Sequence, residues 1–164
     1  PGKGTRFSLY FPVSDGAAVA VPAQDDESDE QRLPVLEAGP ARILLVEDEA
    51  AVRMLAHKAL LKDGHEVTVA EDGDQAVMLV EEGAGPFDLL VTDVVMPGLD
   101  GPATWREIEK LVGPIRVVFM SGYAEEELRK ALGVDGDKVH DTHFLAKPFS
   151  LKALMRKVAE VLQD

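Results

Sequence analysis

The sequence has no cysteine, a deficit of basic residues and no long apolar run, and each shortage excludes a class of protein. Without cysteine the chain can form neither a disulfide framework nor a thiolate metal site, which favours a reducing compartment. Only 17 lysines and arginines stand against 30 aspartates and glutamates, and the net charge of −13 argues against a nucleic-acid or anionic-membrane surface. The acidity suits cationic partners, including metal ions.

No segment has the pattern of a membrane span or of a signal peptide. The longest apolar runs fall far short of the roughly 20 residues that cross a bilayer. We therefore expect a cytoplasmic chain with no direct membrane contact. The chain begins with Pro1 rather than methionine and enters directly into a strand-like motif. This start suggests part of a longer parent protein, which could itself carry a membrane anchor.

Composition divides the 164 residues into a tail and one domain. Residues 1–12 contain an alternating, strand-like segment. Residues 13–40 include the acidic run 25–30, which has too few apolar groups to offset the entropy of ordering. We predict that 13–40 is a flexible, acidic linker rich in proline and alanine, and that 41–164 is the domain.

Five short apolar runs alternate with helical patterns in this domain. Each run is typical of a strand buried on both faces, and the segments between them repeat apolar residues at helical spacing. The predicted strands are 42–46, 66–70, 87–92, 115–120 and 143–146. The predicted helices are 49–63, 72–83 and 102–112, one that begins near Ala124, and one capped by Ser150. This alternation predicts a parallel sheet covered by helices on both faces.

Charged and polar residues follow four of the predicted strands directly. Asp93 closes the third apolar run, and the pair Glu47–Asp48 follows the first. Ser121 follows the fourth run and Lys147 the fifth. Because ligands bind beyond the carboxyl ends of parallel strands, we expect these residues to form one site.

The residue types at this site are chemically complementary. Three carboxylates brought together repel one another unless a cation lies between them, and oxygen ligation suits Mg²⁺. The Lys147 ammonium and the Ser121 hydroxyl could hold the oxygens of a phosphoryl group. Asp93, between the metal and these groups, would then be the nucleophile.

Four motifs resemble, in order and spacing, the signatures of the response-regulator receiver domain of two-component signalling. They are Leu44-Leu45-Val46-Glu47-Asp48-Glu49, Thr92-Asp93-Val94-Val95-Met96-Pro97-Gly98-Leu99-Asp100-Gly101, Ser121-Gly122-Tyr123 and Lys147-Pro148-Phe149. The resemblance covers about 41–164. It implies a doubly wound, five-stranded parallel sheet of the flavodoxin-like order 2-1-3-4-5 with five helices.

The resemblance also implies a role for each site residue. Asp93 would be the phospho-acceptor, taking a phosphoryl group from a phosphohistidine, with Lys147 pairing with that group. Ser121 would be the hydroxyl switch residue, and Phe144 the aromatic residue that reorients with it. Mg²⁺ would be bound by Glu47, Asp48, Asp93 and the backbone carbonyl of Val95. The Lys147–Pro148 peptide would be cis.

Residues 1–12 resemble the last glycine-rich turn and strand of a histidine kinase ATP-binding domain. A receiver after a kinase is the layout of a hybrid sensor histidine kinase, and the motifs around Val94 and Ser121 are similar to those of cell-cycle hybrid kinases. The expected partners are the histidine kinase domain of the parent chain and a histidine phosphotransfer protein. With most of the ATP-binding domain absent, we expect no kinase activity from these residues themselves.

Two apolar residues on the predicted helix 49–63 lie away from its core stripe of Val52, Leu55 and Ala59. Met54 and Leu61 lie about 160° to 180° from that stripe at roughly 100° per residue. Scattered exposed apolar groups are common, but this face flanks the Asp93 site and could dock the helices of a histidine-bearing partner. Elsewhere, we expect Trp105 to be a packing residue that is partly exposed.

Two other functions compete with the phospho-accepting one. A Mg²⁺-dependent phosphohydrolase could use Asp93 as its nucleophile, but it would need a second acid two residues later, where the chain has Val95. A receiver that is never phosphorylated could act as an interaction module. The intact acidic pair, Asp93 and Lys147 argue against that second alternative.

Overall fold

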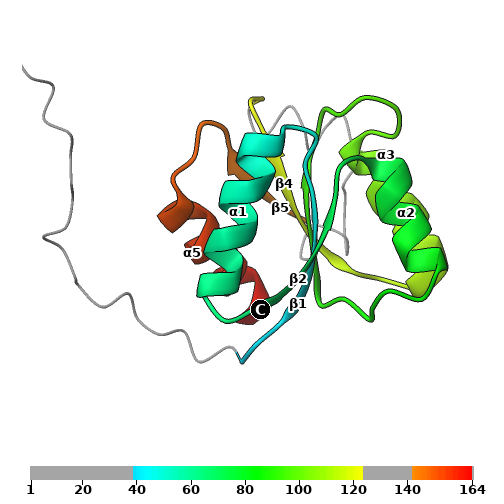
Figure 1. Ribbon diagram of the computed structural model, residues 1–164, viewed down its shortest axis with the longest axis horizontal. Helices are drawn as coiled ribbons and strands as arrows, with labels where there is room; N and C mark the ends of the chain where they lie inside the picture. The colour runs from blue at the N-terminus through cyan, green and yellow to red at the C-terminus, as the bar shows by residue number, and fades with distance from the viewer. Residues whose placement is uncertain (1–38, 124–141, 164) are drawn as a thin grey trace, which may run out of the picture. The chain divides into compact units, whose positions relative to one another are not determined.

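Five parallel strands form the sheet of the domain, as a computed structural model shows for residues 39–123 and 142–163 (Figure 1). The strand order is β2-β1-β3-β4-β5, and every neighbouring pair is parallel. The predicted doubly wound α/β fold is therefore confirmed. The strands are β1 (Arg42–Val46), β2 (Glu66–Ala70), β3 (Leu89–Asp93), β4 (Arg116–Ser121) and β5 (Thr142–Ala146).

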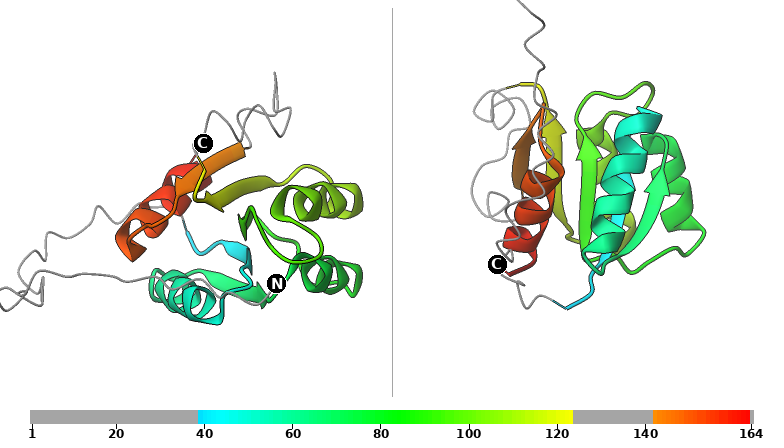
Figure 2. Two further views of the ribbon diagram at one scale, coloured as in Figure 1. Left: turned by 90° about the horizontal axis from the view of Figure 1, so that it is seen from above. Right: turned by 60° about the vertical axis from the view of Figure 1, so that its left-hand side comes forward.

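Helices cover both faces of this sheet (Figures 1 and 2). The described helices are α1 (Ala50–Lys62), α2 (Gly73–Glu81), α3 (Gly101–Val112) and α5 (Leu151–Gln163). In Figure 1, α1 and α5 lie on one side and α2 and α3 on the other. The helix expected near Ala124, the strand-like segment 1–12 and the linker up to residue 38 lie outside the described residues. Among the described helices, none is long and apolar enough to cross a membrane.

The helix starts follow the capping residues in the sequence. Asp72 Oδ1 accepts the Gln75 N–H at 2.7 Å. Ser150 Oγ accepts the Ala153 N–H at 3.1 Å, which confirms the predicted cap. The start of β3 differs from the prediction, because β3 begins at Leu89 and not at residue 87. Just before it, the Asp88 carboxylate accepts the Arg42 N–H at 2.7 Å. At the amino end of β1, a side chain therefore takes the place of a backbone acceptor.

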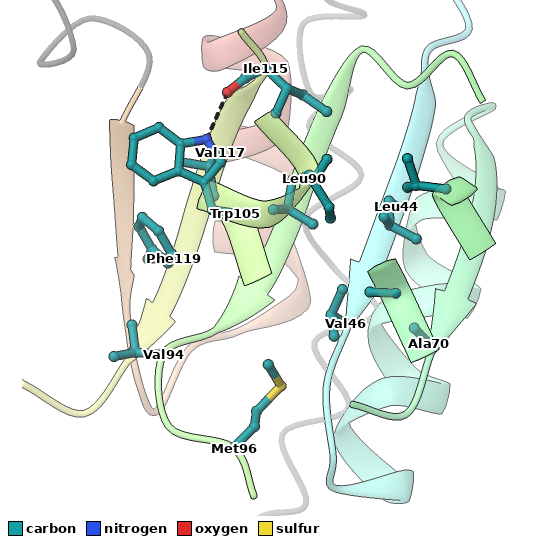
Figure 3. Packing of buried hydrophobic residues seen from close by; sticks show 13 residues of the cluster. Leu44, Val46, Ala70, Leu90, Val94, Met96, Trp105, Ile115, Val117 and Phe119 are labelled. Carbon is teal, nitrogen blue, oxygen red and sulfur yellow. Dashed lines mark hydrogen bonds between the residues drawn. The ribbon is translucent and has the colours of Figure 1, made fainter. Parts of the chain in front are cut away.

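Trp105 is buried in the core between α3 and the sheet, and the expectation of partial exposure was wrong. Its side chain is 3% exposed, and the indole Nε1–H donates to the Ile115 carbonyl oxygen at 3.1 Å (Figure 3). Its ring meets Phe119 edge-on at 5.9 Å. Because the polar N–H has a backbone partner, the whole indole can leave water without an unsatisfied donor.

On the other face of the sheet, the rotation of α1 departs from the predicted core stripe. On α1 the buried residues are Ala56, Ala59 and Leu60, whereas Leu55 is 50% exposed. Consecutive helical residues are about 100° apart, so a helix that turns Ala56 to the sheet leaves Leu55 at the margin. Leu151, the first residue of α5, is likewise 39% exposed. Met54 and Leu61 are 52% and 48% exposed, as their spacing predicted.

Candidate functional site

The register of the sheet brings the predicted site residues to one edge. Val46 of β1 pairs with Thr92 of β3, so the residues that follow them, Glu47 and Asp93, are neighbours. Ser121 of β4 pairs with Ala146 of β5, which places Lys147 next to the end of β4. The Lys147 backbone N–H donates to the Ser121 carbonyl oxygen at 2.7 Å. These positions at the carboxyl ends of the strands are those expected from the apolar runs.

Three carboxylates converge at this edge. Glu47, Asp48 and Asp93 each offer one oxygen, and these oxygens lie within 4.8 Å of one another. Glu47 is fully buried, Asp93 is half-buried and Asp48 is exposed. A set of carboxylate oxygens that is open to solvent on one side suits Mg²⁺, which binds few protein oxygens and keeps several waters. The residues therefore fit the metal expected from the sequence.

The ammonium of Lys147 bridges two of these acids. Nζ donates to Asp93 Oδ2 at 2.6 Å and to Glu47 Oε2 and Oε1 at 3.0 and 3.3 Å. Burial by itself would lower the pKa of Lys147, but the hydrogen bonds to Asp93 and Glu47 outweigh it and the pKa is raised. Lys147 is thus held in its charged form. The following Lys147–Pro148 peptide is cis, in agreement with the expectation.

For Glu47, burial is the main cause of the pKa shift. Desolvation raises the pKa of Glu47, and the contacts with Lys147 offset only part of that effect. The negative charge of Asp93 raises it further, whereas the Glu49 backbone N–H lowers it. The site therefore contains a carboxylate whose charge the fold disfavours until a cation compensates it.

The loop after β3 holds Asp93 in place through its backbone. Asp93 Oδ1 accepts the Val95 N–H at 3.2 Å, and the Gly101 N–H donates to the Val94 carbonyl oxygen at 3.1 Å. A Cβ at Gly101 would clash with the Asp93 carbonyl oxygen, so only glycine allows the start of α3 to approach this closely. The Val95 side chain, in contrast, is 62% exposed at the rim of the site.

The two predicted switch residues lie on neighbouring strands, Ser121 on β4 and Phe144 on β5. Ser121 is buried at the end of β4, and its Oγ accepts the Tyr123 N–H at 2.9 Å. Phe144 on β5 is half-buried, and its ring lies 5.9 Å from that of Phe119 at an interplanar angle of 31°. Phe144 thus packs partly in the core.

Arg53 is a contact of the site that the sequence analysis missed. Its Nη1 donates to the backbone carbonyl oxygens of Glu47 at 2.6 Å and Asp48 at 3.1 Å. The available signal was its position near the N-terminus of α1, where the helix dipole disfavours a positive charge. A cation there calls for a compensating partner.

A groove of about 440 Å³ adjoins the site between α1 and the segment after β5. Its apolar lining comes from Val52 and Leu55 on one side and from Pro148, Phe149 and Leu151 on the other. Glu49 and Lys147 also line it. This groove accounts for the exposure of Leu55 and Leu151, which face open space rather than the sheet.

Comparison with known proteins identifies relatives of similar sequence. The chain is 40% identical over 164 residues to the sensor kinase CckA of Brucella abortus, covering 99% of this chain but only 17% of that protein. It is 36% identical over 121 residues to the response regulator receiver protein CpdR of the same organism, covering 74% of this chain and 96% of CpdR.

The similar solved structures include receiver domains of histidine kinases. The receiver domain of the hybrid histidine kinase CckA is 40% identical with a TM-score of 0.61, covering 74% of this chain and 99% of that one. The receiver domain of the sensor histidine kinase PA1611 from Pseudomonas aeruginosa, which holds a magnesium ion in its active site cleft, is 27% identical with a TM-score of 0.63, covering 77% and 100%. Residues 43–159 match the response regulator receiver domain, and the chain belongs to that family of two-component signalling proteins.

Proposed function

We propose that Asp93 accepts a phosphoryl group from a phosphohistidine and exchanges it with a histidine phosphotransfer protein. The observation that carries this proposal is the bridge formed by Lys147, which contacts Asp93 at 2.6 Å and the buried Glu47 at 3.0 Å. A positive charge that is fixed beside one reactive carboxylate can stabilise the negative oxygens of a transferring phosphoryl group.

The chemistry needs a nucleophile, charge neutralisation and orientation, and the described residues supply all three. An Asp93 carboxylate oxygen attacks phosphorus in line, and the bond from phosphorus to the donor histidine nitrogen breaks as the acyl phosphate forms. Lys147 neutralises the phosphoryl oxygens, and the Val95 N–H holds the other Asp93 oxygen. Water later hydrolyses the acyl phosphate.

We assign Mg²⁺ to Glu47, Asp48, Asp93 and the backbone carbonyl of Val95. When bound, the metal would neutralise negative charge on the carboxylates and on the phosphoryl oxygens. The burial of Glu47, which raises its pKa, supports the assignment, since a nearby cation favours the charged form of a buried acid. The magnesium reported for the PA1611 receiver is consistent with it.

We assign the response to phosphorylation to Ser121 and Phe144. The Ser121 hydroxyl, which accepts the Tyr123 N–H, would turn towards the phosphoryl oxygens. Phe144 would follow into the space that is released, altering the surface of β5 and α5. Because Phe144 has no hydroxyl, its reorientation would work by packing, including its packing against Phe119.

We also propose that the domain at 41–164 belongs to a cytoplasmic part of a hybrid sensor histidine kinase, preceded by a kinase remnant at 1–12 and a linker at 13–40. The similarity to the Brucella CckA kinase supports this placement, because it extends over 99% of the chain and so includes the tail. On this layout, the kinase domain of the parent chain is the first phosphoryl donor.

A phosphate analogue tests the acceptor role directly. Beryllofluoride added with Mg²⁺ should shift the amide NMR signals of Asp93, Ser121 and Phe144, because it occupies the position of an aspartyl phosphate. Neither reagent alone should produce the full set of shifts. Spectra that are unchanged by the combination would leave only an interaction module without phosphorylation.

The exposed face of α1 is the proposed docking surface for the helices of the histidine-bearing partner. Met54 and Leu61 are about half exposed on one side of α1. Leu55, on another side of the same helix, lines the groove. The groove also borders Lys147, so a helix that is bound there would lie beside the phosphoryl site. Apolar helix faces commonly bind in such grooves.

Replacing Met54 by aspartate should slow phosphoryl transfer from a phosphorylated partner by about tenfold, because a charge must be desolvated in the apolar contact. Transfer kinetics measured at subsaturating partner concentration would show the change. Met78→Asp is the matched control, since Met78 is 47% exposed on α2, across the sheet from α1 (Figure 1). Both variants should bind Mg²⁺ normally. Equal transfer rates for the two would rule out docking on α1.

A further inference from the structure

Arg53, on α1, contacts both the acidic loop after β1, which contains Glu47 and Asp48, and the segment after β2. Arg53 is the fourth residue of α1, and its Nη1 contacts the carbonyl oxygens of Glu47 and Asp48 at 2.6 and 3.1 Å. Its Nη2 lies 3.8 Å from Glu71 Oε1, just after β2. The Glu71 N–H in turn donates to Gln75 Oε1 at 2.6 Å. The guanidinium thus joins the segments that follow β1 and β2.

The two carbonyl contacts matter more than the ion pair. The Arg53 side chain is 17% exposed, whereas that of Glu71 is 71% exposed, and an ion pair in water contributes little. A hydrogen bond from a charged donor to a backbone carbonyl is stronger, and here one nitrogen holds two consecutive carbonyls. These carbonyls belong to the residues whose carboxylates converge with Asp93.

We propose that Arg53 is a positioning residue for the Mg²⁺ site, an inference that rests on the proposed function. By holding the Glu47 and Asp48 carbonyls on the α1 side, the guanidinium fixes the backbone rotation of both residues. Their carboxylates are then kept within reach of Asp93 before the metal arrives. Groups that orient metal ligands in this way typically change metal affinity about 10- to 100-fold when they are removed.

If Arg53 acted only through its charge, its removal would have the opposite effect on Mg²⁺ affinity. A guanidinium close to the acidic cluster repels a divalent cation, so its removal should strengthen Mg²⁺ binding if electrostatics were its only effect. Weaker binding after removal of Arg53 would therefore identify orientation as its contribution. This opposition of signs separates a positioning role from a general effect of net charge.

The test is a Mg²⁺ titration of the full chain with the wild type, Arg53→Gln and Lys58→Gln, followed by amide NMR shifts near Asp93. Lys58 is exposed on the same helix, so its variant loses the same charge without touching the acidic loop. We expect the dissociation constant to rise about tenfold or more for Arg53→Gln. Lys58→Gln should stay within about twofold of the wild type. Thermal unfolding without Mg²⁺ separates loss of fold from loss of affinity.

Each outcome of the titration supports or contradicts the positioning role of Arg53. If the wild type binds Mg²⁺ and Arg53→Gln binds it equally or more tightly, the positioning role is wrong while the proposed function stands. If the wild type itself does not bind Mg²⁺, the proposed metal site and this inference fall together. Should Arg53→Gln not fold, Arg53→Lys replaces it, because lysine keeps the charge but its Nζ ends one bond short of the Nη1 that contacts both carbonyls. A dissociation constant that Arg53→Lys leaves unchanged would overturn the inference.

Discussion

Replacing Asp93 by asparagine is expected to abolish phosphoryl uptake, with a fall in rate on the order of 10³-fold or more. The amide is nearly isosteric and can still accept the Val95 N–H, so the loop after β3 should keep its conformation. It is a poor nucleophile, however, and cannot form the acyl phosphate. Radiolabel transferred from a phosphorylated histidine phosphotransfer protein measures the loss.

Asp74→Asn provides the matched control for this substitution. Asp74 lies in the first turn of α2, is exposed, and undergoes the same chemical change without facing Lys147. Its variant should accept phosphoryl groups at the wild-type rate. Acid-stable label on Asp93→Asn, or label recovered at Asp48, would show that the acceptor has been misassigned.

Replacing Lys147 by methionine is expected to destabilise the Mg²⁺-free domain by about 2 kcal/mol and to slow phosphoryl transfer roughly 100-fold. The variant leaves Glu47 and Asp93 side by side without their shared cation, and the side chain of Glu47 is only 1% exposed. The corresponding fall in melting temperature is roughly 4 to 8 °C. Adding Glu47→Gln should recover part of the loss, because the amide removes the uncompensated buried charge.

The size of this destabilisation should depend on pH. Without Lys147, burial and the charge of Asp93 both raise the pKa of Glu47, and only the Glu49 backbone N–H is left to lower it. Between the ordinary carboxyl pKa of 4.5 and the raised pKa in the folded variant, the folded chain binds a proton that the unfolded chain has released. The stability of the variant is therefore lost as pH rises through the folded pKa. The charged Lys147 of the wild type, with a raised pKa, contributes equally at pH 5 and pH 8.

Denaturant unfolding at several pH values measures this dependence. The difference between wild type and Lys147→Met should be larger near pH 8 than near pH 5. Lys157→Met is the control, because Lys157 forms a 2.9 Å ion pair with the more exposed Glu160 on the same helix and should cost below about 0.5 kcal/mol. A difference that grows as the pH falls would contradict the assigned environment of Glu47.

The position of each site residue could be predicted because it depends on local pattern. The run Ile43-Leu44-Leu45-Val46 is apolar at every residue, as a strand covered on both faces must be, and all four side chains are buried. The residue after such a run lies at the carboxyl edge whatever the details of packing. Glu47, Asp93 and Lys147 were placed correctly for this reason, and the family resemblance was confirmed.

Contacts that depend on how the elements rotate against one another could not be predicted. Leu55 was expected in the core, but α1 turns Ala56 and Ala59 to the sheet and leaves Leu55 beside a groove. Trp105 was expected to be partly exposed, but the Ile115 carbonyl accepts its indole N–H. Both outcomes depend on side-chain volumes and partners that come from distant parts of the chain.

The sequence by itself determined that three acids, a hydroxyl and a lysine would lie at the carboxyl edge of a parallel sheet, since strand direction and apolar runs are enough to place them there. The strand order that makes them neighbours was implied by the family resemblance. Only the tertiary structure decided how they differ. It buries Glu47 and raises its pKa, leaves Asp48 in water, and places one lysine between Glu47 and Asp93. The physical reason is that desolvation and hydrogen-bond geometry depend on every atom packed around a group, and no local pattern contains that information.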